Sequence, residues 1–378
     1  MRTNSRLIEG IAFYGRGYIP CEGFTFHVKG SHYTGETDGD MNIGIRGIGT
    51  YIPSTYMTAR EIAEATGIPE DVIARKFGVV RKPIPGPDDT PSAMGTAAAL
   101  KALADGGVDA ESIDLVIWNG GQHKDYPCWL AGLKVAHDIG ASRAWSFDME
   151  AMCGSMMVAF SVARSMMLAD GRLKRVLIVS GYRNGDLIDL AVPETRFMLD
   201  IGAGGSAVVL EAGYNRNIIR GYAFKGDGSF SEDCVVPVLG ARRWPPQRTD
   251  TSAMHFVVRD EAEFKKKLND RTMPNFYGVI RESLAESGLT EKDIDYLAIL
   301  HFKRSAHDAV LQELGLSPEQ TTYLDQYGHL GQNDQILSIE LGLESGKIKD
   351  GDNVVMVGAG LGFVWASAVV TWGQEEQK

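Results

Sequence analysis

The sequence predicts an α/β fold that contains a duplicated unit and largely parallel strands. Two observations carry this prediction. Short apolar runs alternate with helix-like segments from residue 41 onward, which is the pattern of an α/β protein. Two short sequence patterns also recur in the same order and at a similar distance, which is typical of an internal repeat.

The individual elements follow from local patterns, taken in chain order. A strand-like segment opens the compact part of the chain at 42–51, and short apolar runs further on suit buried strands. The helix that starts near residue 154 is apolar on most of its circumference, so we expect it to be buried. The expected strands are 42–51, 115–118, 144–149, 176–179, 295–300, 354–357 and 364–370, and the expected helices are 92–104, 153–169, 306–314 and 334–343.

The repeat divides the chain into two halves. Residues 171–174 (GRLK) and 346–349 (GKIK) each precede a strand, and the sequence SAVV at 206–209 returns at 367–370. We therefore expect halves at 41–213 and 214–378, preceded by an amino-terminal extension, 1–40, of unknown role.

Composition excludes several classes of function. The 378 residues are 44% hydrophobic and 23% charged, enough for two domains or one duplicated fold. A net charge of −11 without a long Lys/Arg run argues against a nucleic-acid partner. No apolar stretch approaches the roughly 20 residues of a membrane helix, and the first 40 residues lack a signal-peptide pattern. We expect a cytoplasmic protein without a membrane partner.

Cys153 is the candidate nucleophile. Its position between a strand-like run and a buried helix places the thiol at a helix amino terminus, where the helix dipole favours the thiolate. A structural buried cysteine is the alternative. The chain has four cysteines without CxxC or zinc-like spacing, which predicts free thiols and no metal site: Cys21, Cys128, Cys153 and Cys234.

Three residues of the second half are candidate partners of this thiol. His301 follows the strand-like 295–300, at a carboxyl end where α/β proteins place ligands, although a capping or surface histidine fits the same position. Cys153 lies as far before the motif at 171–174 as Gly328 lies before its repeat at 346–349, so pseudo-symmetry places the turn of His329 opposite the cysteine. Asp334 is either a first-turn carboxylate of a helix or the residue that orients a histidine.

These motifs resemble β-ketoacyl-carrier-protein synthase III of the thiolase superfamily. The resemblance runs from Met41 to Gly373 and is most specific at 47–53 (GIGTYIP), 151–155 (AMCGS) and 295–301 (DYLAILH). It implies a duplicated thiolase-like fold whose central sheets pack around buried helices in αβαβα layers. It also implies thioester chemistry of fatty acid or polyketide biosynthesis, with acyl-coenzyme A or acyl carrier protein as substrates and no permanently bound cofactor.

The resemblance also implies roles for individual residues. Cys153 and His301 match the catalytic residues, and the amides of Cys153 and Gly362 match the oxyanion hole. Tyr126 resembles an acyl-pocket aromatic that reaches across a homodimer interface, and Arg196 matches a coenzyme A contact.

Two departures from the family leave the reaction open. His329 stands where the family has an asparagine, and Phe302-Lys303-Arg304 replaces the usual Gln-Ala-Asn after His301. One reading is decarboxylative condensation of the acyl group on Cys153 with a malonyl thioester, in which His301 and His329 donate hydrogen bonds.

The alternative is transfer to an alcohol, amine or thiol without decarboxylation, with His301 as base and Asp334 as the acid that orients a histidine. A further alternative is an inactive partner subunit of a heterodimeric synthase, against which the presence of Cys153 argues.

Overall fold

The computed structural model describes residues 41–121, 123–245, 247 and 254–373. Contacts group Met41–Lys378 into one compact unit. The expected extension 1–40, with Cys21, lies outside the described residues.

A nine-stranded mixed sheet runs through the compact unit, in the order β11-β12-β13-β8-β1-β7-β6-β4-β5. Five of its eight strand pairs are antiparallel, so the prediction of largely parallel strands is wrong. The reason is that helices cover both faces of the sheet. A strand buried on both faces has a continuous apolar sequence whether its neighbour is parallel or antiparallel. The strands are β1 (Ile43–Tyr51), β4 (Leu115–Asn119), β5 (Trp145–Met149), β6 (Arg175–Tyr182), β7 (Gly204–Ala212), β8 (Ile218–Gly226), β11 (Tyr296–Ile299), β12 (Asn353–Gly360) and β13 (Val364–Thr371).

The sheet consists of two wings that meet at one residue pair, Gly44 of β1 with Ile218 of β8. The expected separate central sheets are therefore joined at this point. Each wing has the same pattern of two antiparallel pairs followed by a parallel pair, β1-β7-β6-β4 in one and β8-β13-β12-β11 in the other. This pattern supports duplication, and the boundary at 213/214 stays a prediction.

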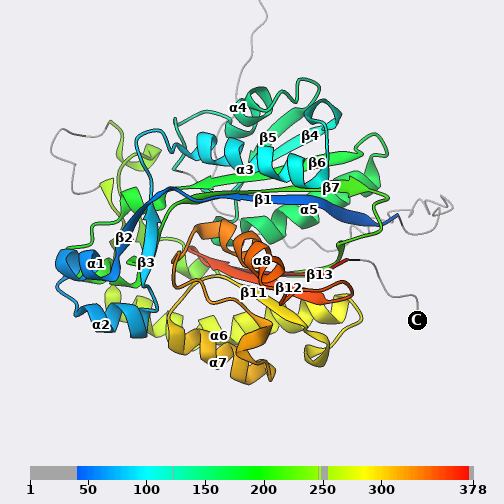
Figure 1. Cartoon of the computed structure of the whole chain (residues 1–378). Helices are drawn as coiled ribbons and strands as arrows, with labels where there is room; N and C mark the ends of the chain where they lie inside the picture. The colour runs from blue at the N-terminus through cyan, green and yellow to red at the C-terminus, as the bar shows by residue number, and fades with distance from the viewer. Residues whose placement is uncertain (1–40, 122, 246, 248–253, 374–378) are drawn as a thin grey trace, which may run out of the picture. The chain divides into compact units, whose positions relative to one another are not determined.

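Helices and wings alternate in five layers (Figure 1). Helices α3 (Pro91–Gly106) and α4 (Ala131–Asp138) cover the outer face of the first wing, and α6 (Glu261–Glu286) and α7 (Arg304–Leu314) cover that of the second. Helices α5 (Ser155–Ala169) and α8 (Asp334–Glu344) lie between the wings. The four helices expected from the sequence match α3, α5, α7 and α8 within a few residues.

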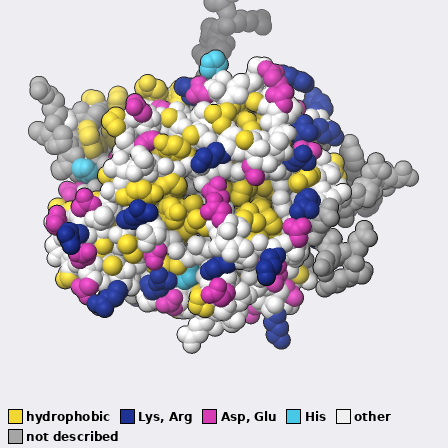
Figure 2. All heavy atoms as spheres, viewed as in Figure 1, with side chains coloured by type: hydrophobic (Ala, Val, Ile, Leu, Met, Phe, Trp, Pro, Cys, Tyr) yellow, Lys and Arg dark blue, Asp and Glu magenta, His cyan; other side chains and the backbone are white. Residues whose placement is uncertain are grey.

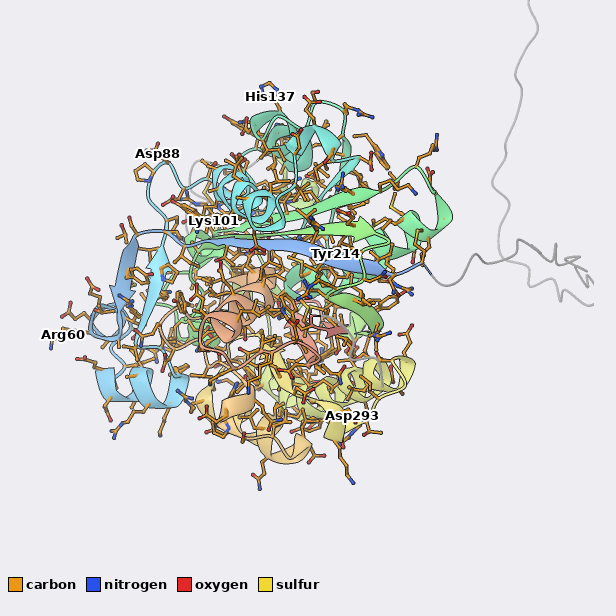
Figure 3. The ribbon with its side chains drawn as sticks, turned by 45° about the vertical axis from the view of Figure 1, so that its right-hand side comes forward. Arg60, Asp88, Lys101, His137, Tyr214 and Asp293 are labelled. Atoms are coloured by element: carbon orange, nitrogen blue, oxygen red, sulfur yellow. The ribbon has the colours of Figure 1, made fainter. Side chains whose placement is uncertain are left out.

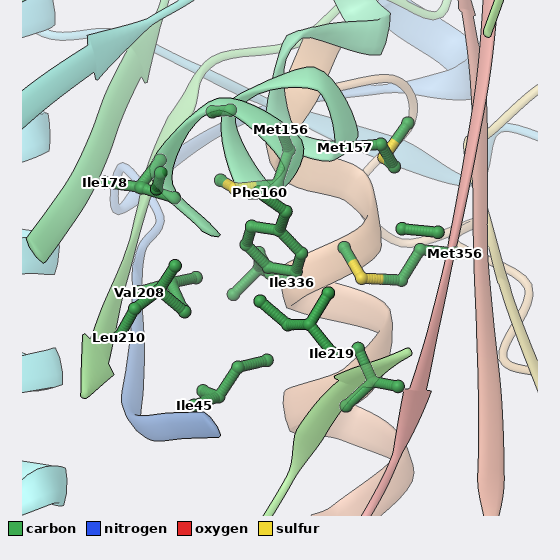
Figure 4. Packing of buried hydrophobic residues seen from close by; sticks show 14 of the residues in the cluster. Ile45, Met156, Met157, Phe160, Ile178, Val208, Leu210, Ile219, Ile336 and Met356 are labelled. Carbon is green, nitrogen blue, oxygen red and sulfur yellow. The ribbon is translucent and has the colours of Figure 1, made fainter. Parts of the chain in front are cut away.

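The central core explains why α5 is so apolar (Figure 4). Contrary to the expectation that no apolar stretch approaches this length, Met152–Ala169 has the length and hydropathy of a membrane span. Residues of α5 nevertheless pack against both wings. Full burial of each large side chain contributes about 1.5–3 kcal/mol. Core residues that meet around this helix include Met156, Phe160, Ile45, Val208, Ile336 and Met356.

Shorter elements surround the layers. The hairpin of β2 (Thr55–Thr58) and β3 (Arg81–Ile84) brackets α1 (Ala59–Thr66), α2 (Glu70–Val72) and a π-helix (Ile73–Phe77). Helix α1 begins with a capping box between Thr58 and Glu61. The remaining elements are β9 (Cys234–Val235), β10 (Val257–Val258) and 3₁₀ turns at Ala110–Ser112, Met152–Gly154, Asn184–Leu187, Pro193–Met198, Gly228–Phe230, Ala241–Arg243, Glu291–Asp293, Pro318–Gln320 and Gly331–Asn333.

Many charged side chains are exposed on the outside of this arrangement. Lys101 of α3 and His137 of α4 are at the periphery, as are Arg60, Asp88 and Asp293 (Figure 3). On the face shown in Figure 2, basic and acidic side chains are interspersed among apolar ones, without a continuous basic stripe.

Candidate active site

Cys153 lies in the 3₁₀ turn Met152–Gly154, between β5 and α5, and its thiol is free and partly buried. The turn places Met152 at φ 49°, a left-handed conformation that is costly for a side chain of this kind. Ser155 braces the turn, because its hydroxyl accepts a hydrogen bond from the Ala151 amide (2.7 Å) and donates one to the Met152 carbonyl (2.6 Å). A β-carbon at Gly360 of β12 would lie 2.7 Å from the Cys153 nitrogen, so only glycine fits there.

His329 connects Cys153 to Asp334. Its Nε2 lies 3.2 Å from Cys153 Sγ, and its Nδ1 lies 2.6 Å from Asp334 Oδ2. The fully buried Asp334 carboxylate also accepts hydrogen bonds from the backbone amides of His301 (2.8 Å) and Leu330 (2.6 Å). Cys153, His329 and Asp334 were each candidates from the sequence. The structure joins them in a Cys-His-Asp triad.

The charges around His329 favour its imidazolium form. Burial lowers the pKa of His329, but the negative charges of Asp334 and Cys153, and hydrogen bonds to both, outweigh burial and raise it well above its usual value. Tyr182, which the sequence reasoning missed, borders the same sulfur. Burial, followed by the charges of Cys153 and Asp334, raises the pKa of Tyr182 well above its usual value, so its hydroxyl stays neutral.

His301 follows β11, as expected, but its ring has other partners than the cysteine. Nδ1 lies 2.8 Å from Asp200 Oδ2, and Nε2 lies 3.0 Å from the Gly78 carbonyl. Burial raises the pKa of Asp200, but the hydrogen bond and charge of His301, with the charges of His329 and Lys82, lower it overall. Both ring nitrogens of His301 therefore already have partners, the Asp200 carboxylate and the Gly78 carbonyl.

This geometry corrects the expectation that His301 is the base next to the nucleophile. Each ring nitrogen of His301 faces another partner, so neither is directed at Cys153. The ring that faces Cys153 is that of His329, and Asp334 orients His329 rather than the His301 side chain.

Asp200 and Lys82 are two further site residues that the sequence analysis did not predict. Lys82 of β3 is buried, and its Nζ donates to the carbonyls of Leu199 (2.8 Å) and Ile201 (2.9 Å), on either side of Asp200. Burial, partly offset by the charge of Asp200, lowers the pKa of Lys82 to about 8. A signal for Asp200 was available, since it directly precedes a glycine-rich turn into β7. Lys82 gave none, because it lies in a short strand of mixed character.

A cavity of about 400 Å³ opens on these groups. Its polar lining includes Cys153, His329, His301 and Asp200. Most of its wall is apolar and comes from the π-helix, α6 and the segments next to β11 and β12. Aromatic residues of this wall are Phe77, Phe197, Phe256, Phe276, Phe302 and Phe363.

The remaining predicted site residues lie elsewhere. Gly362 is in the turn between β12 and β13, so its oxyanion role stays a prediction, and Gly360 is the glycine packed against the Cys153 amide. Tyr126 is 65% exposed and packs edge-on against Trp129. The Arg196 guanidinium donates to the Thr66 carbonyl (3.0 Å). Neither Tyr126 nor Arg196 lines the cavity, and their substrate-binding roles stay predictions.

In the part of the chain that the structure describes, no group of three or more His, Cys, Asp or Glu side chains is placed to hold a metal ion.

Known proteins resemble this chain in sequence and in fold. Residues 147–228 match the family model of 3-oxoacyl-[acyl-carrier-protein] synthase III, and residues 284–372 match the model of its C-terminal part. The first range contains Cys153, and the second contains His301, His329 and Asp334. The β-ketoacyl-[acyl-carrier-protein] synthase III of Allorhizobium ampelinum is 27% identical over 335 residues, which cover 87% of this chain and 98% of that protein. The corresponding protein of Acidiphilium cryptum is 27% identical over 331 residues, covering 86% and 98%.

Solved structures extend the likeness to the whole fold. The priming β-ketosynthase of the R1128 polyketide pathway superposes with a TM-score of 0.76 at 25% identity, covering 88% of this chain and 97% of that one. The synthase III of Thermus thermophilus gives 0.75 at 24% identity, covering 87% and 99%. OleA of Xanthomonas campestris, solved with lauric acid and lauroyl-CoA, gives 0.74 at 19% identity, covering 88% and 99%. The family models, the relatives and the shared fold make this chain a β-ketoacyl-carrier-protein-synthase-III-like acyltransferase of the thiolase superfamily.

Proposed function

We propose that this acyltransferase moves an acyl group from a thioester to Cys153 and then to a second nucleophile without decarboxylation. The observation that carries the proposal is the hydrogen bonding of the two histidines. His329 links Cys153 to Asp334, whereas both ring nitrogens of His301 are occupied by Asp200 and Gly78. The site therefore offers one nucleophile, Cys153, with one base, His329. It does not offer two histidines that are both free to donate hydrogen bonds to a thioester oxygen.

In the first half of the reaction, Cys153 attacks the carbonyl carbon of an acyl thioester. The buried His329 imidazolium stabilises the thiolate and then gives its Nε2 proton to the departing thiol. Coenzyme A or acyl carrier protein would be the carrier of the incoming acyl group, as the names of the relatives suggest. The product of this half is an acyl-Cys153 thioester.

In the second half, His329 is neutral and acts as the general base. Its Nδ1–H stays bonded to Asp334, so the lone pair of Nε2 faces the acyl-enzyme. An alcohol, amine or thiol gives its proton to Nε2 and attacks the acyl carbon, after which Cys153 leaves as a thiolate. A positioned base of this kind contributes about 10²–10⁴-fold to the rate.

The apolar cavity wall suits an acyl chain or the arm of a carrier. Its aromatic residues surround a volume of about 400 Å³ that ends at Cys153. We infer that the cavity binds the acyl chain by burial rather than by hydrogen bonds.

A homodimer is the assembly that fits this proposal. Strand β5 is an end strand of the nine-stranded sheet and carries Trp145, which is 50% exposed. An exposed edge with a large aromatic side chain is a usual site of strand pairing between copies. Light scattering should give about twice the 41.2 kDa chain mass, and a fully active monomer would contradict a shared interface.

Condensation with a malonyl thioester is the second candidate, and the names of the curated relatives favour it. It requires donors at the malonyl thioester oxygen while carbon dioxide leaves. The described geometry favours transfer, because Asp200 and Gly78 already occupy both ring nitrogens of His301.

Labelled carbon dioxide separates the two candidates. Acyl-Cys153 is mixed with carboxyl-labelled malonyl thioester in the presence of an alcohol or amine, and release of label is measured together with loss of the acyl mass from the enzyme. We expect loss of acyl group to an alcohol or amine without label release. Release matched one-for-one with a β-ketoacyl product would establish condensation instead.

A further inference from the structure

Asp200 lies directly beside the catalytic histidine. The His329 amide donates to the Asp200 carbonyl (2.9 Å), and the Gly202 amide donates to the His329 carbonyl (2.9 Å), so the two segments pair like parallel strands. The Asp200 side chain lines the cavity that contains Cys153. A group bound in this cavity therefore meets both the acyl-bearing sulfur and the Asp200 carboxylate.

The two oxygens of this carboxylate differ in their bonding. Oδ2 accepts the hydrogen bond from His301 Nδ1, whereas Oδ1 accepts no hydrogen bond from any described residue. The side chain is 13% exposed. Because an ionised carboxylate can only accept, the cavity presents an acceptor at this point. A carbonyl or carboxylate of a substrate finds no donor there.

We propose that Asp200 selects the acyl acceptor, binding a nucleophile that carries an N–H or O–H group and rejecting a malonyl thioester. This inference rests on the proposed transfer function. In the transfer step, one proton of the amine or alcohol passes to His329 Nε2 while its nitrogen or oxygen bonds to the acyl carbon. The carbon–sulfur bond breaks, and Cys153 keeps the electron pair. An amine donates a second N–H to Asp200 Oδ1, and this hydrogen bond orients the attack. An alcohol donates its hydroxyl proton to Asp200 Oδ1 when it binds, before that proton passes to His329 Nε2.

This role of Asp200 gives a reason for the second imidazole–carboxylate pair, His301 with Asp200, at the cavity that contains Cys153. His301 holds Asp200 Oδ2 and is itself fixed by the Gly78 carbonyl, so the carboxylate cannot turn freely. Lys82 fixes the backbone on both sides of Asp200. A rigid acceptor of this kind costs little to organise when a donor binds.

The test uses the full chain loaded with a hexanoyl group from hexanoyl-N-acetylcysteamine. Loading and loss of the hexanoyl mass are followed by intact-protein mass spectrometry. Butan-1-amine, butan-1-ol and malonyl-N-acetylcysteamine are compared as acceptors, with uncatalysed aminolysis of the free thioester subtracted. The amine and alcohol arms distinguish the two classes of donor.

The variant Asp200→Asn keeps the shape of the side chain but replaces one acceptor by a donor. We expect it to slow transfer to the better of the two donor-bearing acceptors at least about tenfold more than it slows loading, as loss of a hydrogen bond to a charged group predicts. The matched control is Asp325→Asn. Asp325 pairs with Arg304 outside the cavity, and we expect this variant to stay within about twofold of the wild type, since surface pairs contribute little.

Several outcomes would overturn the assignment. Equal slowing of loading and transfer would make Asp200 merely structural, and an unchanged acceptor preference would leave it without a role in selection. If Asp200→Asn does not fold, the wild type decides, because faster reaction with the malonyl thioester than with either donor-bearing acceptor contradicts the proposal. Label release matched with product would overturn the transfer function itself, whereas label-free transfer that Asp200→Asn does not affect would overturn only the role of Asp200.

Discussion

The two imidazole–carboxylate pairs of this cavity have the same parts and different surroundings. In the pair of His329 with Asp334, the second ring nitrogen faces Cys153 Sγ at 3.2 Å. In the pair of His301 with Asp200, the second ring nitrogen meets the Gly78 carbonyl at 3.0 Å. The third partner decides the chemistry, because a thiol can exchange a proton with the ring and a backbone carbonyl cannot. A histidine next to a carboxylate is therefore a catalytic base only where its other nitrogen is free for the reactants.

The largest expected effect comes from removing the sulfur that distinguishes the two pairs. Cys153→Ala should abolish both the acyl-enzyme mass and rapid alkylation by iodoacetamide. Peptide mapping checks this, with the exposed Cys128 as the internal comparison. Burial raises the pKa of Cys234 to about 12, so that thiol should stay unmodified. An acyl group found on Cys128 in the wild type would contradict the site.

Asp334→Asn should produce the next largest effect. Loss of the carboxylate removes the main interaction that raises the pKa of His329 against the opposing effect of burial. The loading rate depends on the imidazolium, so it falls as the pH rises through the pKa of His329. The variant should load about 10²–10⁴-fold more slowly, and its rate should fall at a lower pH than that of the wild type.

Stopped-time acyl-enzyme assays between pH 6 and 10 measure this shift. Asp308→Asn is the control, because Asp308 is mostly exposed and lies outside the cavity. A variant that loads more slowly but keeps the alkaline limit of the wild type would show that Asp334 does not set the protonation of His329.

The smallest expected effect is on stability, and it concerns Lys82, which fixes the backbone on either side of Asp200. The pKa of Lys82 is about 8 in the folded chain and 10.5 in its ordinary state. Between these values the unfolded chain binds more protons, so the free energy of unfolding should rise with pH. The shift corresponds to about 3 kcal/mol at most.

Urea unfolding at pH 7.5 and pH 10 tests this, with Lys82→Met as the comparison. Titrations that both proteins share cancel in the difference. The wild type should gain stability relative to Lys82→Met as the pH rises. An equal change in both proteins would mean that burial does not lower the pKa of Lys82 in the folded chain.

Local patterns predicted much of this molecule because its elements bury continuous faces. The apolar run after Cys153 identified α5, and the glycine-marked loop with the repeat placed His329 opposite Cys153. The histidine expected to act with Asp334 was His301. Strand direction was not predictable, since strands buried on both faces look alike in sequence. Helix α6 was missed because its buried positions, such as Phe264 and Phe276, are separated by long polar stretches.

The role of His301 could not be read from its neighbours in the chain. Its partner Asp200 is 101 residues away, and Gly78 is 223 residues away. Only the tertiary fold brings these acceptors to the ring. The same strand-end position therefore fits a free base and a fixed donor equally well.

The central claim is that His329, not His301, controls the nucleophile. The most direct test is the rate of Cys153 alkylation by iodoacetamide between pH 5 and 9 in the wild type, His329→Gln and His301→Gln. We predict that His329→Gln alkylates at least about tenfold more slowly at pH 7 and gains rate with pH like an ordinary thiol of pKa about 8.5, while His301→Gln stays within about threefold of the wild type. Slow alkylation in His301→Gln, together with a wild-type profile in His329→Gln, would contradict the account.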